Sequence, residues 1–88
     1  MPKQTRIKFK IFMRAIEKCA VQRFGKCNII PKRGSARRIE LFRQKTDKYP
    51  IEMWVVHQDK YVYTWDFKKA YTKLGITKRE FLDIIDSL

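Results

Sequence analysis

The chain has 88 residues, of which 44% are apolar and 14% are aromatic, and it carries a formal net charge of +12. A chain of this length forms one small domain that buries roughly 60–65% of the surface of its unfolded state, which excludes a second domain and a large internal cavity. Its apolar content suffices for one hydrophobic core, so general disorder is excluded as well.

Basic side chains are unevenly distributed along the chain. Residues 1–48 carry the whole net charge, whereas basic and acidic side chains balance over residues 49–88. A solvated basic surface is the simplest explanation, but solubility does not require such an asymmetry. A basic field confined to one half of the chain favours a polyanionic partner, and nucleic acid first.

The two cysteines, Cys19 and Cys27, have no CxxC spacing and no histidine near them in the sequence. A structural metal site needs about four ligands, so we predict no metal and no other cofactor. Reduced thiols are typical of cytoplasmic proteins, and this is the compartment that we predict. The sequence contains neither an apolar run of about 18 residues, the length of a membrane helix, nor a recognisable signal peptide, so we expect no membrane contact.

The first predicted element is a helix. Residues 1–7 are basic, and we expect them to be flexible. The next apolar residues follow the i, i+3, i+4, i+7 spacing of a helix, which predicts an amphipathic helix from Lys8 to Cys19. Its core-facing stripe consists of Phe9, Phe12, Met13 and Ile16.

Three strands are predicted after this helix. Val21 and Phe24 alternate with polar residues, which predicts a short strand and then a turn at Gly25. Alternation in ARRIELFRQ (36–44) predicts the second strand, and IEMWVVH (51–57), rich in β-branched and aromatic residues, predicts the third. On the second strand one face carries Arg37, Ile39, Leu41 and Arg43, and the other carries Ala36, Arg38, Glu40 and Phe42.

Two helices are predicted at the end of the chain. Thr64 is a candidate N-cap for a helix that stops at Gly75. Thr77 and Glu80 have the spacing of a capping box for the last helix. The complete order predicts an α+β domain in which a three-stranded antiparallel sheet is covered by helices on one face.

Several segments of the chain resemble known families. The order helix, strand, strand, strand, helix, with a basic hairpin, resembles the double-stranded-RNA-binding domain (dsRBD), which reads the shape of A-form RNA. More narrowly, RGSARRIELFR (33–43) and YTKLGITKREFLDII (71–85) are similar to segments of HicA (YcfA-like) toxins, which cleave messenger RNA. WVVHQ (54–58) lies where these toxins often carry a histidine. The resemblance extends from about Phe12 to Ile85.

The chain departs from the HicA pattern at two places. The segment between the first helix and Gly34-Ser35 is longer than in compact members of the family. The catalytic histidine that follows Gly-Ser in the family falls on Ala36 here. The resemblance therefore implies a catalytic site at Gly34, Ser35 and Ala36 that lacks its general base. Such a base, which takes the proton of the 2′-hydroxyl, contributes about 10²–10⁴-fold to the rate, so we expect RNA binding with poor cleavage or none. Two origins of Ala36 stay open, an engineered substitution and a natural loss.

Cationic side chains around the Gly-Ser turn are the predicted contacts to RNA. Arg38 shares its side with Ala36 and is expected to hold phosphate. Arg37 lies on the other side and is expected at the edge of the core or beside an acidic residue. His57 is on another strand with its own register, so it could not easily replace the missing base at position 36. A lone histidine near a strand end is most often structural, and its functional alternatives are an RNA contact and a secondary acid/base. The full set of predicted RNA-binding residues is Lys32, Arg33, Arg37, Arg38, Arg43 and His57.

The HicA resemblance implies a function and a partner. The function is that of a type II toxin, a metal-independent endoribonuclease that cleaves mRNA, here in an inactive form. The implied partner is a HicB-type antitoxin protein that covers the active site with an acidic domain, which agrees with the charge of +12. A non-catalytic double-stranded-RNA-binding module is the alternative function, and a small basic phage or ribosome-associated protein is a third.

Overall fold

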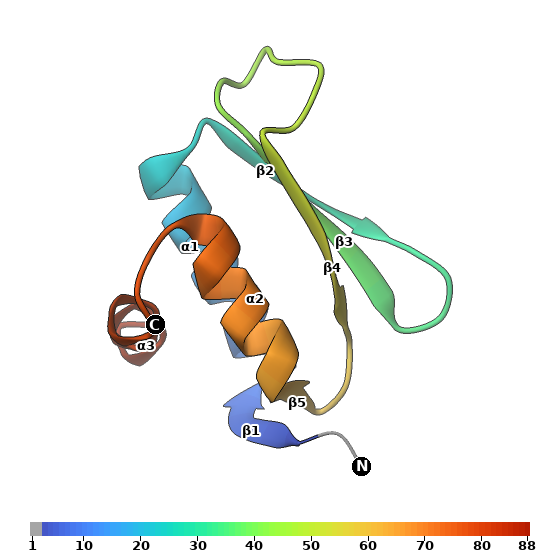
Figure 1. Cartoon of the computed structure of the whole chain (residues 1–88), viewed down its shortest axis with the longest axis vertical. Coiled ribbons are helices and arrows are strands. Elements are labelled where there is room, and N and C mark those ends of the chain that lie inside the picture. Colours follow the sequence, from blue (N-terminus) through green and yellow to red (C-terminus); the bar gives the residue numbers. More distant parts are fainter. Residues whose placement is uncertain (1–2) are drawn as a thin grey trace.

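The computed structural model describes residues 3–88 (Figure 1). In this part of the chain the elements are β1 (Gln4–Lys8), α1 (Phe9–Arg23), β2 (Lys26–Pro31), β3 (Ala36–Phe42), β4 (Glu52–His57), β5 (Tyr61–Tyr63), α2 (Thr64–Leu74) and α3 (Lys78–Asp86). Strands β2, β3 and β4 form a three-stranded antiparallel sheet with β3 at its centre. Strand β1 pairs with β5 in a separate two-stranded sheet. The predicted α+β class and the three-stranded antiparallel sheet are confirmed.

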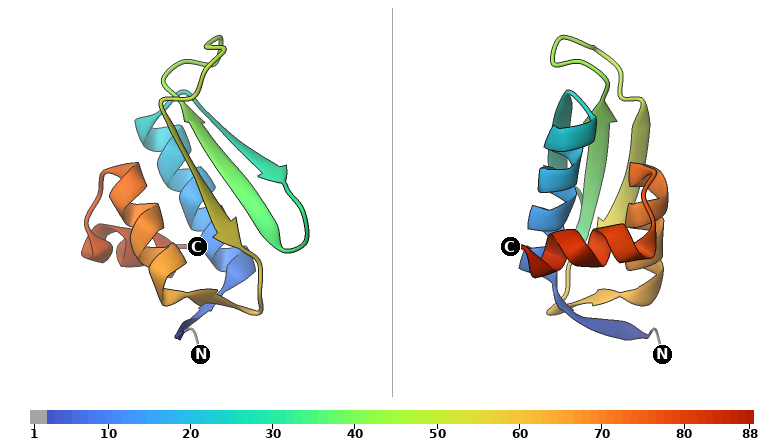
Figure 2. Two further views of the ribbon diagram at one scale, coloured as in Figure 1. Left: turned by 45° about the vertical axis from the view of Figure 1, so that its right-hand side comes forward. Right: turned by 90° about the vertical axis from the view of Figure 1, so that its left-hand side faces the viewer.

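The elements form layers on one side of the three-stranded sheet. Figure 1 shows α1 and α2 on the same face of this sheet. The turned views of Figure 2 place α3 farther from the sheet, across these two helices. None of the described helices covers the opposite face, which we call the open face of the sheet.

The core lies between α1, α2 and the covered face of the sheet. On β3, Ile39 and Leu41 are fully buried, and Ile39 pairs with the buried Trp54 of β4. Because side chains alternate along a strand, Ala36, Arg38 and Glu40 are turned to the open face. The predicted faces of β3 and the helical core stripe are confirmed, since Phe12 and Ile16 of α1 are fully buried.

Helix α1 is longer than its predicted range. It continues through Arg23, so the strand predicted at Val21 and Phe24 is wrong. Buried Ala15, Cys19 and Ala20 extend the helical pattern of burial, whereas Val21 is 74% exposed. Strand β2 begins only at Lys26, beyond Gly25. Alternation over a few residues could not distinguish a strand from the last turn of a helix.

Part of the segment that was expected to be flexible, residues 1–7, forms a strand, while residues 1 and 2 lie outside the described part of the chain. Residues Gln4–Lys8 form β1. The Thr5 hydroxyl donates to the Val62 carbonyl over 2.9 Å, and the Thr64 N–H donates to the Lys3 carbonyl over 3.0 Å. Strand β5, which follows β4 after a short loop, is the partner of β1.

The caps predicted from the sequence for the two C-terminal helices are mostly confirmed. The N-cap of α2 is Tyr63, so the prediction for Thr64 is wrong by one residue. Gly75 ends α2 in the left-handed conformation, with φ of 74°, as its position predicts. The Thr77 hydroxyl accepts from the Glu80 N–H over 3.1 Å, and the Glu80 carboxylate accepts from the Thr77 N–H, so the capping box is present.

Candidate nucleic-acid interface

The Gly-Ser motif forms the turn that joins β2 to β3. The Lys32 N–H donates to the Ala36 carbonyl over 2.9 Å, which continues the ladder of the two strands to the turn. Gly34 has φ of 64°, a conformation that glycine adopts without strain. The N–H groups of Arg33, Gly34 and Ser35 make no hydrogen bond to the described residues. An anion can accept hydrogen bonds from successive N–H groups in a turn.

Arg37 and Gln58, the residue after β4, donate hydrogen bonds to this turn. The Nη1 of Arg37 donates to the carbonyls of Gly34 and Ala36 over 3.1 and 2.8 Å. The Gln58 N–H donates to the Ser35 carbonyl over 2.8 Å. Arg37 therefore stabilises the turn from the covered side and does not join the open face. Its contacts in the structure are to the backbone of the turn, and within residues 3–88 no acidic side chain pairs with it. Its role as an RNA contact stays a prediction.

The register of the sheet brings Ala36 and His57 together. Ala36 pairs with His57 across β3 and β4, so their side chains lie next to each other on the open face. By alternation, Lys32 lies on the same face on the other side of Ala36. The expectation that the register of β4 separates His57 from position 36 is wrong. Ala36 is a small residue between a lysine and an imidazole.

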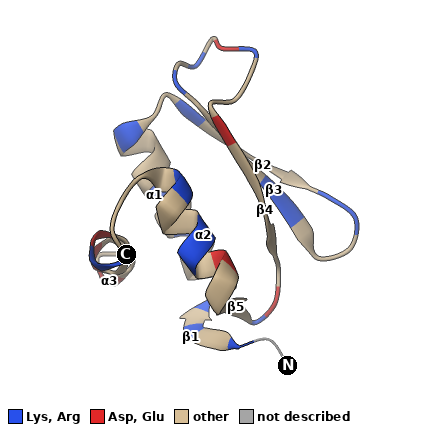
Figure 3. Ribbon diagram, viewed as in Figure 1, with Lys and Arg blue, Asp and Glu red and all other residues tan. Residues whose placement is uncertain are grey.

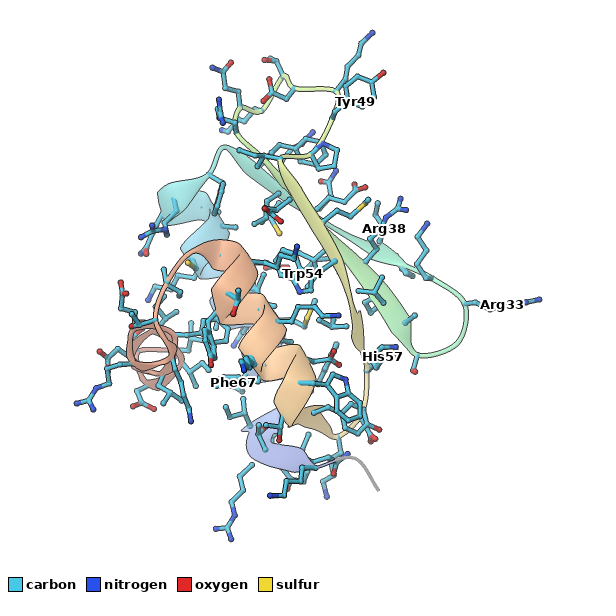
Figure 4. The ribbon with its side chains drawn as sticks, in the orientation of Figure 1. Arg33, Arg38, Tyr49, Trp54, His57 and Phe67 are labelled. Carbon is cyan, nitrogen blue, oxygen red and sulfur yellow. The ribbon has the colours of Figure 1, made fainter. Side chains whose placement is uncertain are left out.

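Arg38 adds a second cation to the open face, one row farther along β3. Figure 4 shows Arg38 and His57 on the side of the sheet away from the helices, whereas Trp54 points toward them. The Nε of Arg38 lies 3.4 Å from Glu40 Oε2, and the side chain is 33% exposed. Glu40 holds the stem of the arginine and partly compensates its charge. The predicted placement of Arg38 beside Ala36 is confirmed.

His57 is backed by a buried carboxylate. Asp66 of α2 is 1% exposed, and its Oδ2 accepts from the His57 backbone N–H over 3.0 Å. The same oxygen lies 3.4 Å from His57 Nδ1, while the His57 side chain is 49% exposed. Asp66 Oδ1 is buried without a hydrogen-bond partner among the described residues. Asp66 lies in the first turn of α2, where the helix dipole favours a negative charge.

Two other predicted contacts lie apart from Ala36 and His57: Arg33 is in the turn of the hairpin, and Arg43 follows the end of β3. Arg33 projects from the hairpin turn into solvent in Figure 4 and is exposed. Arg43 follows the last residue of β3, about 23 Å from Ala36 along an extended strand. Figure 3 shows Lys and Arg on β1, α1, the hairpin, the β3–β4 loop and α2, so the basic half of the sequence does not gather into one patch. We define the candidate interface as Lys32, Arg33, the N–H groups of the turn, Arg38 and His57.

Sequence reasoning missed two features near this interface. The first is the contact of Asp66 with His57, because no sequence signal connects Asp66 to a strand residue nine positions earlier. An open hollow of about 710 Å³ lies beside the β4–β5 loop, between that loop and α1. It is lined by Lys8, Phe9, Lys10, Met13, Arg14, Glu17, Gln58, Asp59 and Lys60.

The cysteines do not add a nucleophile to the interface. Both are free thiols, and Cys19 is buried. Burial raises the pKa of the Cys27 thiol to about 11, with a smaller contribution from Glu17. Within residues 3–88, no group of three or more His, Cys, Asp or Glu side chains is placed to hold a metal ion. None of the helices described combines the length and the apolar character needed to cross a membrane.

Comparison with known proteins yields no relative. No family model, no curated protein and no solved structure matches the chain. The similarity to HicA toxins therefore rests on the short motifs of the sequence.

Proposed function

We propose that this chain binds RNA at the candidate interface. The observation that carries the proposal is the combination of Lys32, Arg38 and His57 on an open sheet face, beside a turn with three unused N–H groups. Phosphate oxygens accept hydrogen bonds from cationic side chains and from backbone N–H groups of this kind. An acidic protein surface would be attracted by the same groups, which agrees with an antitoxin as a second partner.

The type of RNA-binding protein that we propose is a HicA-like toxin, an mRNA endoribonuclease with Ala36 at the position of the family's base. What supports this is that the RGSA and WVVH segments, separate in the sequence, are neighbours at the interface. The proposed protein partner is a HicB-type antitoxin. The finer fold assignment, a dsRBD-like core of α1, β2, β3, β4 and α2 with β1, β5 and α3 added, belongs to the same proposal.

A non-catalytic double-stranded-RNA-binding module is the second candidate function. Ala36 itself favours it, because a methyl group cannot take a proton from a ribose hydroxyl. Both candidates predict RNA binding, and they differ in what a histidine at position 36 would do.

The experiment compares the chain with Ala36 with two variants, Ala36→His and, as the matched control, Ala36→Gln. Affinity for single-stranded and duplex RNA, the cleavage rate and the growth of expressing cells are measured for each. For a HicA-like toxin, Ala36→His raises the cleavage rate above that of the chain with Ala36, by up to about 10²–10⁴-fold where no other group acts as the base, and arrests growth, and Ala36→Gln does neither.

Two results would contradict the proposal. Tight binding of duplex RNA without any gain of cleavage in Ala36→His supports the binding module instead. Failure of all three proteins to bind either RNA overturns the proposed function altogether. Thermal melting of each variant confirms that the fold is intact.

A further inference from the structure

We propose that His57, oriented by Asp66, is a general base for RNA cleavage at this interface, so that the chain retains catalytic capacity despite Ala36. The inference rests on the proposed binding of RNA. It concerns the cleavage that follows binding, in which the 2′-hydroxyl of a ribose attacks the adjacent phosphate. The register of β3 and β4 is the observation behind it, because it places the only histidine of the sequence beside position 36.

The first part of the argument is the orientation of the imidazole. Asp66 Oδ2 lies 3.4 Å from His57 Nδ1, on the buried side of the ring. A carboxylate at this place favours the tautomer that carries its proton on Nδ1, which leaves Nε2 as the acceptor. The contact is longer than a formed hydrogen bond, and catalytic pairs commonly tighten when the substrate is bound.

The second part is that the fold does not need an imidazole at this position. Asp66 is held in the structure by the backbone N–H of His57, a bond that any residue other than proline at position 57 would donate. The His57 side chain is 49% exposed and is absent from the hydrophobic core. The oxygen that faces the ring is Oδ2 of a carboxylate that is 1% exposed, and it can accept from Nδ1 as well as from the backbone N–H.

The third part is the space and the charge in front of the ring. Ala36 lies directly opposite His57, and its methyl group leaves space on the open face in front of the imidazole. Arg38 is the diagonal neighbour of His57 on the same face, and such neighbours lie about 7–8 Å apart, with a somewhat shorter distance between their β-carbons. A phosphate bound between Arg38, Lys32 and the N–H groups of the turn would place the adjoining ribose over Ala36, within reach of Nε2.

The proposed step balances without a metal or a redox partner. The 2′-hydroxyl gives its proton to His57 Nε2, and the 2′-oxygen forms a bond to the adjacent phosphorus. The bond between phosphorus and the 5′-oxygen breaks. The imidazolium returns the proton through water to the departing 5′-oxygen. The products are a 2′,3′-cyclic phosphate and a 5′-hydroxyl, and the cations of the interface stabilise the charge on the phosphorane oxygens.

The experiment measures RNA affinity and RNA cleavage separately for the chain with Ala36 and for its variants. The probe is a single-stranded RNA of mixed sequence, labelled at its 5′ end, under single-turnover conditions with excess protein. The variants are His57→Gln, His57→Ala and Asp66→Asn, with Asp83→Asn on α3 as the control prepared in the same way. An RNA with 2′-deoxyribose throughout tests the requirement for the attacking hydroxyl.

The expected result is slow cleavage that yields a cyclic phosphate and depends on His57. His57→Gln lowers the rate by about 10²–10⁴-fold, whereas its RNA affinity falls by about tenfold at most, the effect of losing one of several contacts at the interface. Free imidazole restores part of the rate to His57→Ala. Asp66→Asn still accepts from the His57 backbone N–H but no longer favours the required tautomer, so the rate falls while the affinity stays constant.

Each contrary result has a distinct meaning. RNA binding without cleavage, or cleavage that His57→Gln leaves unchanged, overturns the role of His57 and leaves the proposed binding intact. Absence of RNA binding overturns both proposals. His57 is on the surface, so its variants decide the matter even if Asp66→Asn fails to fold.

Discussion

Gly25 and Gly34 are constrained for different physical reasons. A β-carbon on Gly25 would lie 2.6 Å from the carbonyl oxygen of Arg43 and from the α-carbon of Gln44, both of which are backbone atoms. The Gly25 N–H also donates to the Phe42 carbonyl over 2.8 Å, so the two segments are held together. Gly34 has open space around it, and only its positive φ favours glycine.

We therefore expect Gly25→Ala to lower the free energy of unfolding by about 1–3 kcal/mol, as overpacking does elsewhere. Gly34→Ala is the comparison, with an expected loss of about 1–2 kcal/mol from conformational strain alone. Urea unfolding followed by circular dichroism measures both. A Gly25→Ala protein with the unfolding midpoint of the natural chain would show that the backbones of α1, β2 and the β3–β4 loop can move apart.

Residue placement at the interface was predictable only in part. Alternation alone put Arg38 beside Ala36 and Arg37 on the other face, and the structure confirms both. What alternation could not supply is the partner of each side chain. Arg37 bonds to turn carbonyls, and His57 faces Asp66, because these contacts depend on how a turn and a helix pack against the sheet.

At the scale of elements, the capping box of α3 and the end of α2 at Gly75 were predicted correctly, whereas the C-terminal end of α1 and the strand β1 were not. The capping box of α3 joins neighbouring residues, so it needs no tertiary contact to form. The pairing of β1 with β5 joins residues more than fifty positions apart, as the bond between Gln4 Nε2 and Asp59 Oδ2 illustrates. Local pattern carries no information on such a partner, which is why β1 was missed.

The capping box makes a prediction for α3. Thr77→Ala removes the acceptor of the Glu80 N–H and should lower the free energy of unfolding by about 1 kcal/mol. Thr77→Ser keeps a hydroxyl and should change stability by much less. Thermal and urea unfolding of the two variants provide the measurement, and equal destabilisation by both would mean that the threonine acts through its methyl group instead.

At the scale of the whole molecule, a high net charge differs from a localised binding site. Figure 3 shows basic residues on several layers of the fold, and a uniform positive field would attract RNA without selecting a surface. The proposed interface instead attributes binding to a few cations around one hairpin. The salt dependence of RNA affinity distinguishes these two accounts, because it counts the phosphates that the protein neutralises.

For the localised interface, contacts from Lys32, Arg33 and Arg38 predict a slope of about −2 for the logarithm of affinity against that of salt concentration with single-stranded RNA. Arg33→Glu should weaken binding by about tenfold or more and make the slope shallower by about 0.7. Lys68→Glu on α2 changes the net charge equally but should alter neither quantity by much. Equal effects of the two variants would favour the uniform field.

The sequence by itself determined the elements whose signals are local: the core stripe of α1, the alternating faces of β3, and the caps of α2 and α3 at Gly75 and Thr77. Only the tertiary structure decided the pairing of β1 with β5 and the meeting of Ala36, His57 and Asp66. The physical reason is the range of the interactions. Helix periodicity and caps act within a few residues, whereas strand register and helix docking depend on packing between distant segments.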